Sequence, residues 1–181
     1  MEFVYELHGQ GWASGYIEIN EKKCEFVCSY LSAGISELIE RLKQLITDDQ
    51  DINPNPMYWE EEPNGTYWTV KKVDQDQLLV QIEYGDEFGD KQELLLQETV
   101  LFKDFVKIIL SVTTKLLRHH GIVGYRQSWG HEFPLADYLQ LKTFFEDNPI
   151  TVEQIDVEGY KDYADHYTTV LSTELKLLGN L

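Results

Sequence analysis

The fold is decided by residues 101–118, LFKDFVKIILSVTTKLLR. Their apolar residues recur at steps of three and four, which is the period of one face of an α-helix. Ile108 and Leu110 widen this apolar face beyond the stripe of an ordinary surface helix. Few residues are left for a solvent-exposed side: Lys103, Asp104, Lys107, Thr114 and Lys115. Because such a helix must be covered on most sides, we expect a β-sheet to pack against it.

The rest of the chain alternates between strand patterns and helix patterns. Seven strands are predicted, over residues 3–8, 16–19, 24–31, 58–62, 67–73, 78–84 and 93–99. Further helices are predicted over 35–46, 135–145 and 168–178, and an irregular segment over 122–134. Asn64-Gly65 is predicted to be the turn of a hairpin. The order βββ-α-ββββ-α-α-α predicts an α+β fold, with a mostly antiparallel sheet of about six to seven strands and helices packed on one face.

The size and composition of the chain are those of one folded domain over residues 1–181. Hydrophobic residues make up 43% of the 181, which is enough for a sizeable core. Residues 146–166 contain seven acidic side chains and one lysine. This segment is either an ordered acidic connection or partly mobile.

The net charge of −17 narrows the class of partner. Asp and Glu number 32, against 15 Lys and Arg. This excess opposes binding to nucleic acids and to anionic membranes, and it attracts basic proteins or peptides. The alternative explanation, that the charge only keeps the protein soluble, stays open.

The two cysteines are predicted to be buried thiols. Cys24 and Cys28 lie four residues apart in a strand, so their Cα atoms are expected about 13 Å apart, too far for a disulfide. Unpaired cysteines fit a cytoplasmic protein. The N-terminal residues show no signal-peptide pattern, and no apolar stretch reaches the roughly 18 residues of a membrane span.

The glycine-rich start of the chain does not match a nucleotide-binding motif. Gly9, Gly11 and Gly15 miss the dinucleotide fingerprint by one residue, and strand-like residues follow where a helix should begin. We therefore expect these glycines in turns and bulges, and we predict no cofactor.

Patterns for metal binding and catalysis are also missing. His119 and His120 are adjacent, so on a helix their side chains should diverge by about 100° and not share a metal ion. No nucleophile elbow is present. A catalytic role would depend on Glu60 or His131 without a supporting motif. We expect neither a metal site nor enzymatic activity.

The strongest candidate site is an acidic stretch that also carries aromatic residues. The predicted partner-binding residues are Asp48, Asp49, Asp51, Tyr58, Trp59, Glu60, Glu61, Glu62 and Trp68. At an interface, aromatic side chains supply affinity, while charges steer the encounter and select the partner. Alternatively, the tryptophans belong to the core, and the acidic residues belong to an ordinary solvent-exposed surface. A separate alternative is a small-molecule pocket between sheet and helices, near Tyr125, Trp129 and His131.

The layout of the whole chain resembles that of small acidic bacterial proteins of unknown function, including cytoplasmic immunity proteins that neutralise polymorphic toxins. The resemblance is carried by the sheet-forming N-terminus and by Ser29-Tyr30-Leu31-Ser32, which leads into an amphipathic helix. Trp59-Glu60-Glu61-Glu62-Pro63, which opens a hairpin, adds to it. The resemblance implies a non-catalytic protein that binds a basic toxin partner, and it transfers no functional residue.

Overall fold

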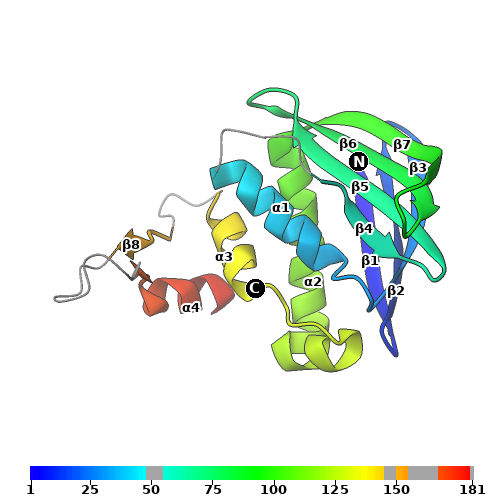
Figure 1. Ribbon diagram of the computed structural model, residues 1–181. Coiled ribbons are helices and arrows are strands. Elements are labelled where there is room, and N and C mark those ends of the chain that lie inside the picture. The colour runs from blue at the N-terminus through cyan, green and yellow to red at the C-terminus, as the bar shows by residue number, and fades with distance from the viewer. Residues whose placement is uncertain (48–54, 145–149, 155–166, 180–181) are drawn as a thin grey trace, which may run out of the picture.

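The computed structural model describes residues 1–47, 55–144, 150–154 and 167–179 (Figure 1). The strands are β1 (Glu2–Gly9), β2 (Trp12–Ile19), β3 (Lys22–Ser29), β4 (Met57–Glu60), β5 (Asn64–Lys72), β6 (Gln77–Asp86), β7 (Lys91–Leu101), β8 (Glu153–Gln154) and β9 (Tyr167–Thr168). The helices are α1 (Ile35–Thr47), α2 (Phe102–Trp129), α3 (Leu135–Thr143) and α4 (Leu171–Gly179). This content confirms the predicted α+β class.

The seven long strands are divided between two antiparallel sheets. One sheet has the order β1-β2-β3 and the other the order β4-β5-β6-β7, while β8 and β9 pair separately. The side chains of Asn20 and Lys22, where β3 begins, both donate hydrogen bonds to Glu98 of β7. Near the other end of β3, the backbone N–H of Val27 donates to Glu61, just beyond β4. β3 therefore crosses the second sheet from β7 to β4.

A layer of aromatic rings joins the two sheets. Phe26 of β3 lies edge-on to Trp59 and Trp68, with ring centroids 5.2 and 5.3 Å away. Phe3 of β1 also meets Trp68 edge-on. Figure 1 shows α1, α2 and α3 together on one side of the strands. The core between sheets and helices is continuous, because the buried residues of all these elements belong to one cluster.

The long helix α2 has the apolar face that its sequence predicts. Phe105 and Ile109 are fully buried, whereas Lys103 is exposed. Gly121, at φ 65°, interrupts the helical backbone, and a glycine with positive φ commonly ends a helix. Beyond it, residues 122–129 are helical again, so the prediction of an irregular segment was wrong there.

The physical reason for this further helical segment is the spacing of its aromatic residues. Tyr125 and Trp129 lie four residues apart, and both are fully buried. Side chains at that spacing share one face of a helix. A helical backbone therefore buries both rings at once.

The hairpin between β4 and β5 turns earlier than Asn64-Gly65, so that prediction was wrong. Glu60 pairs with Gly65, and the N–H of Glu61 donates to the carbonyl oxygen of Asn64 at 2.7 Å. Gly65 lies within β5, where a side chain would collide with the carbonyl oxygen of Trp59. As a result, Glu61 and Glu62 lie at the tip of the hairpin.

The C-terminal part of the chain is described only in pieces. Most of the acidic segment 146–166 lies outside the described residues, and its predicted state is not tested. Helix α4 is held by the buried Leu177, whose carbonyl oxygen accepts a hydrogen bond from Lys142 at 2.6 Å. Among the described residues, no helix has both the length and the apolar character needed to cross a bilayer.

The two cysteines are buried and unpaired, as predicted. Burial raises the pKa of the Cys24 thiol to about 11 and that of the Cys28 thiol to about 12. The thiolate is the reactive form of cysteine, so both side chains should be inert near neutral pH.

We expect a thiol reagent to modify the native protein about a hundredfold more slowly than the unfolded chain near pH 8. The reason is that the pKa of the Cys24 thiol rises from 9.0 to about 11, which lowers its thiolate fraction about a hundredfold, and the higher pKa of Cys28 lowers its thiolate fraction further. The rate is followed by absorbance with an aromatic disulfide reagent, with and without concentrated guanidinium chloride. Equal rates in the two conditions would show that the thiols are accessible in the folded state.

Candidate functional site

Trp59 and Trp68 are fully buried, so the prediction that they are exposed anchors was wrong. Their rings stack with centroids 4.3 Å apart, and the indole N–H of Trp68 donates to the hydroxyl of Thr66 at 3.0 Å. Side chains alternate along a strand, and the tryptophans occupy the faces of β4 and β5 that meet the first sheet. They therefore stabilise the domain and cannot contact a partner.

The neighbouring tyrosines occupy the opposite face of the second sheet. Tyr58 and Tyr67 pack against each other with ring centroids 4.7 Å apart. The hydroxyl of Tyr67 donates to the backbone carbonyl of Asp86. Burial, followed by the negative charge of Glu60, raises the pKa of Tyr58. This pair of rings connects the β4–β5 hairpin to the turn between β6 and β7.

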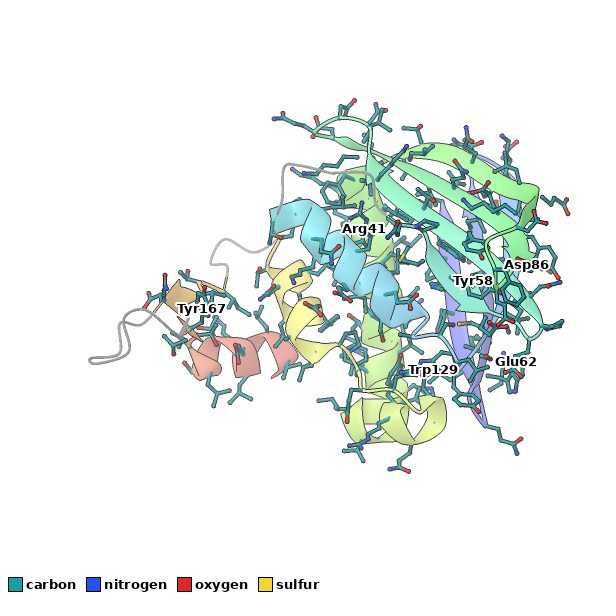
Figure 2. The ribbon with its side chains drawn as sticks, in the orientation of Figure 1. Arg41, Tyr58, Glu62, Asp86, Trp129 and Tyr167 are labelled. Carbon is teal, nitrogen blue, oxygen red and sulfur yellow. The ribbon has the colours of Figure 1, made fainter. Side chains whose placement is uncertain are left out.

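The register of the second sheet places two acidic turns side by side. Asn64 of β5 pairs with Asp86 of β6, and its side-chain amide donates to the hydroxyl of Tyr84 at 2.9 Å. Figure 2 shows Tyr58, Glu62 and Asp86 at the same end of the molecule. The carboxylates of the two turns form a surface that we call the acidic tips: Glu60, Glu61, Glu62, Asp86, Glu87 and Asp90.

The acidic tips also carry an exposed aromatic side chain that the sequence analysis missed. Phe88, in the turn between β6 and β7, is 87% exposed. The carboxylate of Asp86 accepts hydrogen bonds from the backbone N–H groups of Phe88 and Asp90, each at 3.0 Å, and so orders this turn. No sequence signal marks Phe88, since an isolated apolar residue in a polar turn is common.

Glu61 extends the negative surface onto the first sheet. It lines a hollow of about 750 Å³ together with Glu6 and Glu25. Burial raises the pKa of Glu61, while the N–H of Val27 at 3.4 Å opposes this shift. Glu25 is paired with Lys23 at 2.8 Å, and this hydrogen bond lowers its pKa. The hollow thus contains carboxylates in both solvated and partly desolvated settings.

The predicted site residues are brought together only in part. Glu60, Glu61, Glu62 and Tyr58 lie at or beside the acidic tips. Asp48, Asp49 and Asp51 lie outside the described residues.

In comparisons with known proteins, no family model, no curated protein and no solved structure matches this chain. A proposal about the function of this chain therefore rests on the chemistry of its own surfaces.

The alternative pocket near Tyr125, Trp129 and His131 is filled by the side chains that were expected to line it. Tyr125 and Trp129 are fully buried, and the hydroxyl of Tyr125 lies 3.4 Å from that of Ser36. His131 is partly buried, and its ring nitrogen hydrogen-bonds the carbonyl oxygen of Tyr30. These contacts fix the loop before α1 against the end of α2, which is a structural role. The prediction of a pocket lined by the two buried rings was wrong.

The titratable groups of the described residues do not form a metal centre. No three His, Cys, Asp or Glu side chains in this part of the chain are placed to hold one ion. What the acidic tips offer chemically is a set of hydrogen-bond acceptors and negative charges beside one aromatic ring.

Proposed function

We propose that this protein is a non-catalytic binding domain that engages a basic partner protein through its acidic tips. The observation that carries the proposal is the strand register that places two acidic turns side by side, which together hold six carboxylates and the exposed ring of Phe88. Residues 60–62 and 84–90 contain no lysine or arginine. Lys91, which follows the second turn, is bound to Glu83 at 2.6 Å and is not free to neutralise the surface.

The free energies of the two kinds of contact indicate that binding uses both ion pairs and an aromatic contact. An exposed ion pair contributes only about 0–1 kcal/mol, so charges of this kind mainly speed and orient the encounter. Burial of one phenylalanine side chain contributes about 1.5–3 kcal/mol. Phe88 supplies such an apolar contact within the charged surface. Several weak ion pairs and one aromatic contact together give both steering and affinity.

A more specific form of the proposal is an immunity-type protein that covers a basic toxin domain in the cytoplasm. The excess of acidic residues supports this form, because a negative surface complements a basic one. The two free, buried thiols are also consistent with a reducing compartment. The alternative of a small-molecule site near Tyr125 and Trp129 has less support, because both rings are sealed in the core.

The proposal is tested by the triple variant Glu62→Lys, Glu87→Lys, Asp90→Lys. The probe is a fluorescent peptide of lysine, arginine and phenylalanine residues, and its Kd is measured by anisotropy at 0.1 M salt. We expect the variant to bind at least about tenfold more weakly, because three attractive charges become repulsive. Glu60 and Glu61 are kept because their carboxylates accept the backbone N–H groups of Glu62 and Val27.

A matched control separates the acidic tips from the overall charge. The variant Glu21→Lys, Glu40→Lys, Asp76→Lys makes the same change in net charge at exposed acids elsewhere. It should retain affinity within about threefold, since charges beyond the Debye length of about 10 Å at 0.1 M salt are screened. Equal weakening by the two triple variants would mean that the acidic tips are not the binding site.

A further inference from the structure

A second surface of different chemistry lies at the β1 edge of the first sheet, whereas Glu61 contacts β3 at the opposite edge. At the β1 edge, a cleft of about 560 Å³ separates β1 from α2. Its walls are residues 3–8 of β1 and five residues of α2. The cleft is a space between sheet and helix, but it is not the one predicted near Trp129.

One wall of the cleft is the backbone edge of a strand. Successive side chains of a strand point to opposite faces. Phe3 and Tyr5 face the core whereas Glu6 and His8 are exposed, yet all four line the cleft. Side chains from the two opposite faces of β1 can line one cleft only if the backbone edge of β1 forms the wall between them.

That edge has unused pairing capacity. β1 is an outer strand, and in the described part of the chain it pairs with β2 alone. Residues 3–8 make no other backbone–backbone hydrogen bond among the described residues. An unpaired edge of this kind is a template for an additional strand.

The other wall is one face of α2. Val112, Lys115, Leu116 and His119 follow the three-and-four spacing of a helix face. Val112 and Leu116 are buried and give the cleft an apolar floor, whereas Lys115 and His119 are exposed at its rim. A residue pointing into the cleft would therefore meet methyl groups, and one pointing out would meet hydrogen-bond donors.

Most polar side chains of the cleft can donate a hydrogen bond, and one of them, Lys115, is a cation. Three of the five histidines of the chain line it, namely His8, His119 and His120, together with Lys115 and a single carboxylate, Glu6. The rings of His119 and His120 do not diverge as predicted but lie edge to face, with centroids 4.6 Å apart. Burial, followed by the charge of His119, lowers the pKa of His120. A neutral imidazole still donates through one ring N–H, so Lys115 and three imidazoles offer donors beside a single carboxylate, Glu6, in a chain whose net charge is −17.

We propose that the cleft binds an extended acidic peptide segment of a partner protein, which adds to the edge of β1 as a further strand and lies along α2. Six strand residues span about 20 Å, so residues 3–8 can pair with a peptide of similar length. Main-chain hydrogen bonds supply the affinity in this mode of recognition, and alternate side chains supply the selectivity. Apolar side chains of the peptide contact Val112 and Leu116, and its carboxylates reach Lys115 and the histidine rings.

The negative charge of the whole molecule does not prevent this binding. At physiological ionic strength the Debye length is about 8 Å, so the charges nearest the peptide dominate. None of the residues of the acidic tips lines the cleft. Val4 and Glu6 line both the cleft and the hollow that contains Glu61, so the two proposals are tested with separate probes and separate variants.

The test uses a fluorescent peptide in which valine alternates with glutamate, at physiological salt. A second peptide carries N-methyl groups on alternate backbone amides, which removes main-chain donors and leaves the side chains unchanged. We expect the first peptide to bind and the N-methylated peptide to bind at least about tenfold more weakly. Hydrogen exchange should slow at alternate amides within residues 3–8 when the first peptide is bound.

Two variants of α2 with equal charge change test the other wall. Lys115→Glu with His119→Glu should weaken binding at least about tenfold. Lys103→Glu with Gln127→Glu, at exposed positions outside the cleft, should leave the Kd within about twofold. The proposal is overturned if the valine–glutamate peptide does not bind at millimolar concentration, or if N-methylation has no effect. Displacement of the peptide by free glutamate at equal concentration would also overturn it, because the site would then recognise a small anion.

Discussion

Gly15→Ala is expected to reduce the free energy of unfolding by at least about 3 kcal/mol, a large share of the total for a domain of this size. Gly15 lies within β2, opposite Tyr5 of β1 and Phe26 of β3. A Cβ atom there would lie 1.8 Å from the carbonyl oxygen of Val4 and 2.9 Å from the Phe26 ring. Because the nearer obstacle is backbone, the strands themselves must separate to admit a methyl group. Urea unfolding followed by tryptophan fluorescence measures the loss.

Gly124→Ala is the matched control for this substitution. Gly124 lies in the helical segment before Trp129, and a methyl group at this position would lie 3.9 Å from its nearest neighbour, the Cβ atom of His120. Alanine is favoured over glycine in a helix by about 1 kcal/mol, so the control should be as stable as the parent protein or slightly more stable. A Gly15→Ala variant with parental stability would contradict the close approach of β1 to β2.

Trp68→Ala is expected to reduce the free energy of unfolding by about 3–5 kcal/mol. The ring of Trp68 is fully buried between Trp59, Phe3 and Phe26, and its N–H is bound to Thr66. Truncation removes these ring contacts and leaves a cavity where the two sheets meet. The change is measured by chemical denaturation, with binding of the basic peptide measured on the same variant under native conditions.

The control for Trp68 is Phe88→Ala, which removes an aromatic ring that is 87% exposed. It should change stability by no more than about 0.5 kcal/mol, because few contacts are lost. It should also weaken binding of the basic peptide, since Phe88 is the aromatic contact of the acidic tips. The reverse pattern, with a stable Trp68→Ala that fails to bind and an unstable Phe88→Ala, would restore the surface assignment of Trp68 and contradict the packing of the two sheets.

The sequence alone predicts those helices and strands in which the spacing of apolar residues shows which side is buried. The apolar period of residues 101–118 predicts the central helix because the three-and-four spacing has one structural solution. The same reasoning predicts α1 and the burial of Cys24 and Cys28. It does not predict the helical segment after Gly121, where only two aromatic residues carry the pattern.

The candidate site was predicted less well, because it depends on which face of a strand is covered. Tyr58 and Trp59 are adjacent, as are Tyr67 and Trp68, so each face of the β4–β5 pair carries one aromatic residue per strand. Alternation alone does not say which face meets the first sheet. The glutamates of the first hairpin were found from their clustering, whereas their proximity to Glu87 follows from strand register.

By itself, then, the sequence determined the α+β class, the order of the elements, the buried thiols and the excess of negative charge. These are properties of composition and of local periodicity, and each can be read within one element. Tertiary structure alone decided that the seven strands form two sheets, that the tryptophans are internal, and that two turns form the acidic tips. It also decided that the outer edge of β1 faces α2 across a cleft. The physical reason is that pairing and packing join residues far apart in the chain, and no local pattern specifies which partners meet.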